Sequence, residues 1–278
     1  MNIILEISGG LGKSVMGVAV VSAIKKQYPE GNIIVVTAYP EVFINNPDVY
    51  RALPFGSLYF YENYVNSETR IFKMEPYQSE DYLKGKGHLI RIWCEIHGIT
   101  YNGELPKIYL SDFELQKARA MKGKKPLMLI QPFGGANKDI KYSWNRDIPI
   151  SQAQEIIKKY EDKYDIIQIA REDQPTVAKR FSSNFRDVAA LIAVSDKRIF
   201  IDSFAQHTAA SLELPSTVCW ITNTPEMFGY KIHNNIQARK FDKDIRPIQS
   251  YLEKYDFTGS MTYQFPYKDE NVFNLDEI

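Results

Sequence analysis

The chain has 278 residues, 44% of them apolar and 24% charged, which is the balance of a globular protein with room for two domains. Its 34 basic and 34 acidic residues give a net charge of zero, so composition provides no general attraction for nucleic acid. The two cysteines, Cys94 and Cys219, lie far apart in apolar stretches. This argues against a disulfide framework and favours a reducing cytoplasm.

The opening of the chain predicts neither a signal peptide nor a membrane span. Its longest uncharged run, residues 14–24, falls short of the ~20 apolar residues that cross a bilayer. Glu6 precedes that run, and no basic segment opens the chain. We therefore expect a cytoplasmic protein that makes at most peripheral contact with the inner face of a membrane.

The first elements predicted form a β-α-β unit. Residues 2–7 (NIILEI) predict a buried strand, residues 14–28 a helix capped by Ser14, and residues 32–37 (NIIVVT) a second strand. Strands joined in this way are parallel, with a right-handed crossover. Further along, we expect a strand at 57–61 and a helix at 88–97.

A second unit of the same kind begins at Pro126, where PLMLIQPFGGA runs from an apolar strand into a paired-glycine turn. The charged stretch 112–125 before it has the most linker-like composition, so we predict domains at 1–122 and 123–278. The remaining elements expected are helices at 151–164, 187–194, 203–212 and 245–255 and strands at 165–170, 198–202 and 216–221.

Strands and helices alternate in both halves, which predicts an α/β protein with parallel sheets covered on both faces. Two Rossmann-like domains side by side enclose a central cleft, and a glycine turn from each half is available to face it.

The N-terminal glycine turn, SGGLGKSVMG at 8–17, ends in GKS as a nucleotide-binding P-loop does, but its spacing differs. A P-loop requires glycine where this chain has Ile7, and the dinucleotide fingerprint requires its third glycine where this chain has Val15. A P-loop hydrolase is therefore the weakest interpretation. Gly10 and Gly12 instead allow the chain to turn tightly beside the cleft.

The segment IDSFAQHTAA at 201–210 is the sharpest local signal of a binding site. A strand ends in Asp202 and Ser203 and a helix of small residues follows, so free backbone N–H groups point beyond the sheet edge, as in diphosphate sites. His207, four residues after Ser203, lies on the same helix face. The alternative is an ordinary N-cap followed by a core histidine.

The stretch IDSFAQHTAASLELPSTVCWITNTPEMFGY resembles the donor-binding segment of the heptosyltransferase-like glycosyltransferases of family 9. That family has an Asp-Ser/Thr-Gly-x-x-His-x-x-Ala run, then a Pro-Thr strand and a Thr-x-Pro loop. The N-terminal turn with its helix and strand, and QPFGGANKDIKYSWNRDIPISQAQEI, resemble the starts of the family's two domains. The resemblance extends from residue 1 to about residue 230.

The resemblance implies a GT-B architecture that holds a nucleotide-diphosphate sugar mainly in the C-terminal domain. It implies transfer of the sugar, from an ADP-heptose-like or other donor, to a glycan or lipid-linked acceptor in surface polysaccharide synthesis, without a metal or separate cofactor. The residues it places at the donor are Gly134, Gly135, Lys141, Asp202, Ser203, His207 and Thr222.

Two positions depart from the family pattern. Phe204 replaces the glycine that follows Asp-Ser, and Lys13 replaces an aspartate thought to deprotonate the acceptor. A lysine with an ordinary pKa of about 10.4 is protonated at neutral pH and cannot act as that base.

Three accounts of Lys13 follow. It binds an anionic acceptor, it is desolvated enough to act as a base, or catalysis has been lost and the protein is a degenerate GT-B binder of a nucleotide or glycan. We favour the first account, with the base supplied by another residue. The candidates for that base are Glu6, Asp81, His88 and Glu95.

Overall fold

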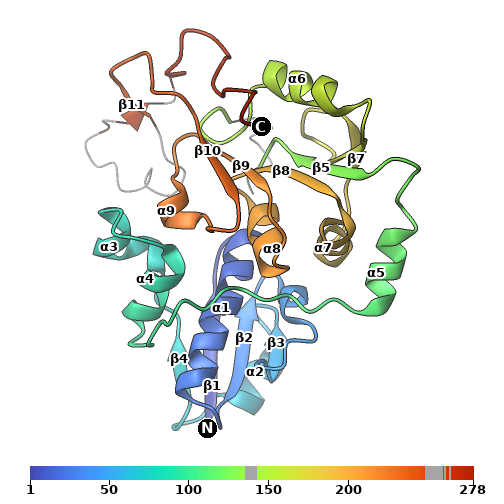
Figure 1. Ribbon diagram of the computed structural model, residues 1–278. Coiled ribbons are helices and arrows are strands. Elements are labelled where there is room, and N and C mark those ends of the chain that lie inside the picture. Colours follow the sequence, from blue (N-terminus) through green and yellow to red (C-terminus); the bar gives the residue numbers. More distant parts are fainter. Residues whose placement is uncertain (135–142, 248–258, 260, 263) are drawn as a thin grey trace.

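The computed structural model describes residues 1–134, 143–247, 259, 261–262 and 264–278. It contains two parallel sheets, each forming the centre of one lobe, and the lobes lie one above the other (Figure 1). The predicted α/β fold with two parallel-sheet lobes is therefore confirmed.

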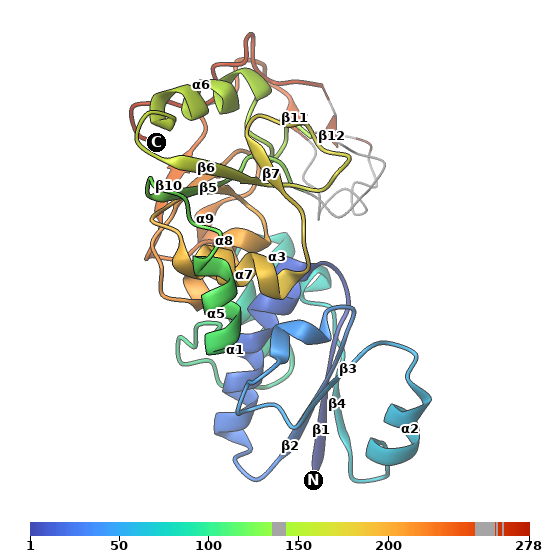
Figure 2. The ribbon, with the colours of Figure 1, turned by 90° about the vertical axis from the view of Figure 1, so that its right-hand side faces the viewer.

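The N-terminal lobe is built on a four-stranded sheet in the order β3-β2-β1-β4. Side chains alternate along β1: Ile3, Leu5 and Ile7 pack on the α1 side, whereas Ile4 packs with Phe60 of α2 on the other. Figure 2 shows the two helices on opposite faces of the sheet. The elements are β1 (Asn2–Ile7), α1 (Leu11–Gln27), β2 (Asn32–Thr37), η1 (Pro40–Phe43), β3 (Arg51–Leu53), α2 (Leu58–Tyr64), β4 (Arg70–Phe72), η2 (Pro76–Gln78), α3 (Glu80–Leu83) and α4 (Leu89–Ile96).

Two local predictions in this lobe are wrong. The strand expected at 57–61 is the start of helix α2, because Phe60 and Tyr64 stand four residues apart and turn to the same core. Ser14 does not cap α1, which begins at Leu11 after Gly10; its hydroxyl is buried 3.0 Å from that of Thr37. The helix predicted at 88–97 is confirmed as α4.

The C-terminal lobe has a six-stranded parallel sheet in the order β10-β9-β8-β5-β6-β7. Counted from β5, this is the doubly wound order 3-2-1-4-5-6 read backwards, with its switch point between β5 and β8. Helix α6 covers one face, and α7 and α8 cover the other (Figure 2). The elements are β5 (Leu127–Gln131), α6 (Ile150–Tyr160), β6 (Asp165–Ile169), β7 (Lys179–Phe181), α7 (Phe185–Val194), β8 (Lys197–Ile201), α8 (Phe204–Ser211), β9 (Thr217–Trp220), α9 (Pro225–Phe228) and β10 (Asn234–Gln237).

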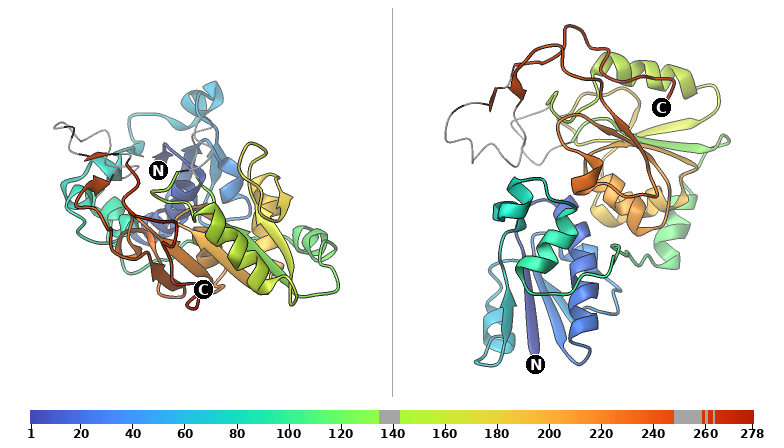
Figure 3. Two further views of the ribbon diagram at one scale, coloured as in Figure 1. Left: turned by 90° about the horizontal axis from the view of Figure 1, so that it is seen from above. Right: turned by 60° about the vertical axis from the view of Figure 1, so that its left-hand side comes forward.

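Beyond β10 the described residues stay with the C-terminal lobe, which is the upper lobe in Figure 1 (Figure 3). The helix predicted at 245–255 does not begin at residue 245. Strand β11 (Arg246–Pro247) lies there instead and pairs with β12 (Met261–Thr262), so this part of the prediction is wrong. Residues 248–255 of the expected helix lie outside the described residues. The last residues pack against α6, where Gln152 accepts hydrogen bonds from the backbone N–H groups of Val272 and Phe273 and donates one to the carbonyl of Phe273.

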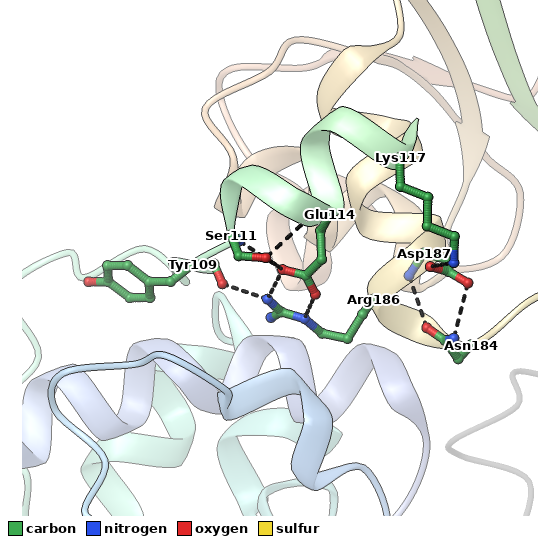
Figure 4. A network of polar contacts seen from close by, with 7 residues as sticks. All are labelled: Tyr109, Ser111, Glu114, Lys117, Asn184, Arg186 and Asp187. Atoms are coloured by element: carbon green, nitrogen blue, oxygen red, sulfur yellow. Dashed lines mark hydrogen bonds and ion pairs between the residues drawn. The ribbon is translucent and has the colours of Figure 1, made fainter. Parts of the chain in front are cut away.

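Helix α5 (Asp112–Arg119) ties the connecting segment to the C-terminal lobe. Arg186 of α7 donates to both carboxylate oxygens of Glu114 at 2.7 Å and to the carbonyl of Tyr109 at 2.7 Å (Figure 4). These bonds from Arg186 lower the pKa of Glu114 to about 2, aided by Ser111 of the capping box and opposed by partial burial. The domain division at 122 stays a prediction, but α5, which precedes it, packs on α7.

The two lobes share one hydrophobic core. The largest cluster of buried side chains joins Val15 and Val18 of α1 to Phe185 of α7, Ala210 of α8 and Trp220 of β9. Within the described ranges, no helix combines the length and hydrophobicity needed to cross a bilayer.

We expect Arg186→Met to lower the free energy of unfolding by about 2 kcal/mol, because it leaves the partly buried carboxylate of Glu114 without its partner. Urea denaturation measures this. The control is Lys117→Met, which removes the ion pair between Lys117 and Asp187. Because the Lys117 side chain is 56% exposed, this change should lower the free energy of unfolding by less than about 1 kcal/mol. Equal stability of the two variants would contradict this account of how α5 is attached.

Candidate functional site

The switch point of the upper sheet brings together residues that follow β5 and β8. Gly134 comes after β5, and Ser203 comes directly before α8. A methyl group on Gly134 would lie 3.5 Å from the hydroxyl of Ser203 and 3.3 Å from Cδ of Arg146. Ligands of doubly wound sheets bind at this edge, outside the carboxyl ends of the strands. Arg146 was missed by the sequence reasoning, although it lies within the quoted segment QPFGGANKDIKYSWNRDIPISQAQEI.

The first turn of α8 has no side chain capping it. Ser203 is the N-cap residue with extended backbone, but its hydroxyl makes no cap hydrogen bond. Asp202 is 7% exposed and accepts a hydrogen bond from the amide of Asn223, in the loop after β9. Thr222 in the same loop donates to the carbonyl of Asn145 at 2.8 Å. The helix N-terminus is therefore left to the site, while Asp202 and Thr222 fix the surrounding loops.

Asp147 anchors both ends of the glycine-rich loop that follows β5. Its carboxylate accepts from the backbone N–H of Gly134 at 2.8 Å and of Ser143 at 2.7 Å. Burial raises the pKa of Asp147 to about 7, against the lowering effect of these two N–H groups. The predicted donor residues Gly135 and Lys141 lie between these anchors, outside the described residues.

A cavity of about 610 Å³ opens beside the carboxyl ends of β9 and β10. Ile221, which follows β9, and Gln237, the last residue of β10, line it. Gln237 donates to the carbonyl of Ile221 at 3.0 Å, which holds the two strand ends together. The volume is within the usual range for small-molecule sites. Its other lining residues are Ala238, Arg239, Lys240, Phe241, Asp242, Lys243, Asp244 and Ile245.

His207 lies at the seam between the lobes and is 3% exposed. Its Nδ1 is 3.0 Å from the hydroxyl of Tyr230, and a methyl group on Gly12 would lie 3.2 Å from its Cδ2. Burial holds the pKa of His207 well below its ordinary value, and the neighbouring His88 and His233 lower it further. In this structure the neutral imidazole joins α8 to α1.

The lower sheet has its own switch point, between β1 and β4. The glycine turn follows β1, and Glu75 follows β4 by three residues. Both carboxylate oxygens of Glu75 lie 2.7 Å from the ammonium of Lys13, and the hydroxyl of Ser8 donates to Oε2 at 2.8 Å. The rings of Trp93 and Tyr77 lie 5.0 and 5.3 Å from the same ammonium. Lys13 is therefore enclosed by aromatic rings and one carboxylate.

The surroundings of Lys13 restrict the first account, in which Lys13 binds an anionic acceptor. An anionic acceptor would have to displace Glu75 to reach an ammonium whose side chain is 4% exposed. The sequence reasoning missed Glu75 because β4 has only three residues, Arg70 among them, and was not predicted. The signal available was the Glu75-Pro76 pair, which marks the start of a turn.

Of the four candidate bases, His88 lies near Tyr230 and His207 at the seam between the lobes. Glu6 is within β1, while Asp81 and Glu95 form ion pairs with Lys86 at 3.2 Å and Arg91 at 2.7 Å. His88 is the N-cap residue of α4 and accepts from the backbone N–H of Ile90; burial lowers its pKa to about 4. Over the described part of the chain, no three His, Cys, Asp or Glu side chains gather to hold a metal ion.

No family model and no curated protein sequence matches the chain. Among solved structures, it is similar to E. coli ADP-heptose LPS heptosyltransferase II, with a TM-score of 0.66 at 14% identity over 88% of this chain and 92% of that one. A glycosyl transferase family 9 protein of Veillonella parvula gives 0.61 at 14% identity over 85% of each chain. The iron-containing dodecameric glycosyltransferase TibC of enterotoxigenic E. coli gives 0.60 at 13% identity, over 87% of this chain and 64% of that one.

The chain therefore has the GT-B α/β fold of heptosyltransferases and family 9 glycosyltransferases. The sequence resemblance to that family and the fold agree.

We expect the melting temperature to fall as pH decreases from about 6.5 to 4. Burial lowers the pKa of His88, His97 and His233 to about 4, so in this window these groups bind protons in the unfolded chain but not in the folded chain; the raised pKa of Asp147, a single group, acts in the opposite direction. Thermal denaturation across pH measures this. His88→Asn keeps a good N-cap and should reduce the pH dependence. If the melting temperature of His88→Asn depends on pH as steeply as that of the unmodified protein, His88 does not contribute to the pH dependence.

Proposed function

We propose that the protein is a glycosyltransferase that moves a sugar from a nucleotide-diphosphate donor to a glycan or lipid-linked acceptor. The observation that carries the proposal is the meeting of the two switch points. A methyl group on Gly12 would lie 3.5 Å from the backbone nitrogen of Phe204, so the glycine turn of one lobe abuts the uncapped first turn of α8 in the other. A donor held there would face the lower lobe.

The donor site is assigned to the upper lobe. The diphosphate accepts hydrogen bonds from the first turn of α8, beside Ser203 and Arg146, because a helix N-terminus carries free N–H groups and partial positive charge. The nucleoside occupies the cavity next to Ile221 and Gln237. Gly135 and Lys141 remain proposed phosphate contacts. The donor is ADP-heptose or a similar sugar nucleotide, in line with the name of the similar E. coli heptosyltransferase.

The acceptor approaches from the lower lobe, and an anionic glycan is one option for it. If the protein makes surface polysaccharide from such donors, it acts in the cytoplasm, at the inner face of the membrane. Nucleic acid is not expected as a partner.

Leaving-group charge on the diphosphate would be stabilised by the α8 N-terminus and nearby cations rather than by a metal ion. Because TibC is described as iron-containing, this point needs its own test. If the proposal is right, activity survives extensive treatment with EDTA and is not raised by added Mg²⁺, Mn²⁺ or Fe²⁺.

One observation favours a second candidate function. Lys13 stands where the resembling enzymes have an aspartate, which suits a GT-B protein that binds a nucleotide or glycan without transferring a sugar. Such a protein would bind ADP but release none from ADP-heptose with any acceptor.

The variant Ser203→Asp tests the donor site. Aspartate is a preferred N-cap, so the melting temperature should stay the same or rise, whereas its carboxylate occupies and repels the diphosphate position. We expect ADP affinity, measured by calorimetry, to fall at least ~10-fold, equal to about 1.4 kcal/mol.

The matched control is Asn184→Asp, which adds the same charge at the exposed N-cap of α7. It should leave ADP binding unchanged. If Ser203→Asp binds ADP as the unmodified protein does, the diphosphate is not at α8. If neither ADP nor UDP, GDP or CDP binds the unmodified protein, the proposed function is wrong.

A further inference from the structure

Glu75 is the acidic residue at the switch point of the lower sheet. It follows β4, the neighbour of β1, and its carboxylate is bonded to Ser8 in the turn that follows β1. Its side chain is 20% exposed, against 4% for Lys13. The carboxylate therefore lies between a buried ammonium and the open end of the sheet.

Lys13 fixes the orientation of this carboxylate. Its ammonium contacts both oxygens at 2.7 Å, in the manner of a clamp, and Trp93 and Tyr77 flank it. The aliphatic part of the Lys13 side chain also lies close to the backbone of Gly9, because a methyl group added at Gly9 would be 3.5 Å from Cδ of Lys13. Buried on all these sides, Lys13 holds Glu75 in one position.

The hydroxyl of Ser8 shows how a substrate hydroxyl can reach Glu75. Ser8 is exposed and donates to Oε2 at 2.8 Å, and its Oγ also lies 3.5 Å from the ammonium of Lys13. A hydroxyl of similar size that displaced it would make the same hydrogen bond.

The position of the turn relates Glu75 to the donor. Residues 8–10 connect β1 to α1, and Gly12, the second residue of α1, abuts the first turn of α8. The segment that carries Ser8 therefore leads directly into the helix residue that contacts α8, where the diphosphate is proposed. Proximity of this kind is what transfer between two substrates requires.

Glu75 is itself paired with Lys13 and caps η2 (Pro76–Gln78), so its place at the switch point of the lower sheet, rather than freedom from partners, distinguishes it from other carboxylates. Asp202 accepts from Asn223 on the donor side, and Asp147 holds two backbone N–H groups. Asp81 and Glu95 pair with cations of their own segments.

We propose that Glu75 is the general base for the transfer and that Lys13 is its positioning residue; this inference rests on the proposed function. The acceptor O–H bond breaks, and its proton goes to a carboxylate oxygen of Glu75. The acceptor oxygen forms a bond to the anomeric carbon with its freed electron pair. The bond from that carbon to the diphosphate breaks, and its electron pair leaves with the nucleoside diphosphate. Glu75 then returns the proton to water.

The test measures ADP release from ADP-heptose, with water and with a panel of lipopolysaccharide-core acceptors. Glu75→Gln keeps the shape of the side chain but cannot take a proton, so we expect kcat to fall by roughly 10²–10⁴ while ADP affinity stays unchanged. Glu68→Gln, an exposed glutamate before β4, is the matched control and should retain full activity. Thermal denaturation confirms that each variant is folded.

Two further readouts separate catalysis from a structural role. Added formate should restore part of the activity of Glu75→Ala, because a free carboxylate can enter the space and accept the proton. Lys13→Met should lower kcat with little change in KM for the donor, and Lys13→Arg should recover part of it, since arginine also binds a carboxylate in two places.

The outcomes are distinguishable. If no nucleoside diphosphate binds the unmodified protein, the proposed function fails and this inference with it. If ADP binds but ADP-heptose is neither transferred nor hydrolysed, or if Glu75→Gln keeps its kcat, the donor site stands and the role of Glu75 is overturned.

Discussion

The contact between the first turns of α1 and α8 is the constraint on which the rest of the molecule depends. It exists because residue 12 is glycine: a methyl group there would lie 3.2 Å from His207 and 3.5 Å from the backbone of Phe204. This close approach lets Val15, Val18 and Ala210 enter a common core, which holds the two sheets at a fixed separation. It also brings the loops at both switch points to the same place.

Two helix N-termini that meet in this way concentrate partial positive charge, which favours anions beside them. In the lower lobe the charge of Lys13, in the first turn of α1, is compensated by Glu75 from another strand end. In the upper lobe Asp202 turns to Asn223, and α8 is left without a side-chain cap. This difference between the two helix N-termini suits an anionic ligand at α8 in the upper lobe and the proposed role of Glu75 as a general base in the lower lobe.

Sequence reasoning recovers the parts of this structure that local patterns specify. Apolar runs in the sequence predicted the strands β1, β2, β5, β6, β8 and β9, because a strand buried on both faces of a sheet consists of nearly continuous apolar residues. It failed at β4 and α2, which are short and whose assignment depends on packing against distant residues. The same holds for the site. The Asp202-Ser203 strand end is visible in the sequence, but Lys13 and Glu75 are 62 residues apart, and nothing local predicts their pairing.

The most direct test of this account is hydrogen exchange measured by mass spectrometry, with and without saturating ADP. The N–H groups that open a helix lack partners within it, and in α8 that of Gln206 donates to the carbonyl of the N-cap residue Ser203 at 3.2 Å, so a bound diphosphate should slow exchange mainly at Phe204 and Ala205. The account predicts slower exchange in peptides that cover 202–206, together with smaller slowing across the glycine turn at 8–12. Binding of ADP that leaves exchange in both segments unchanged would contradict it.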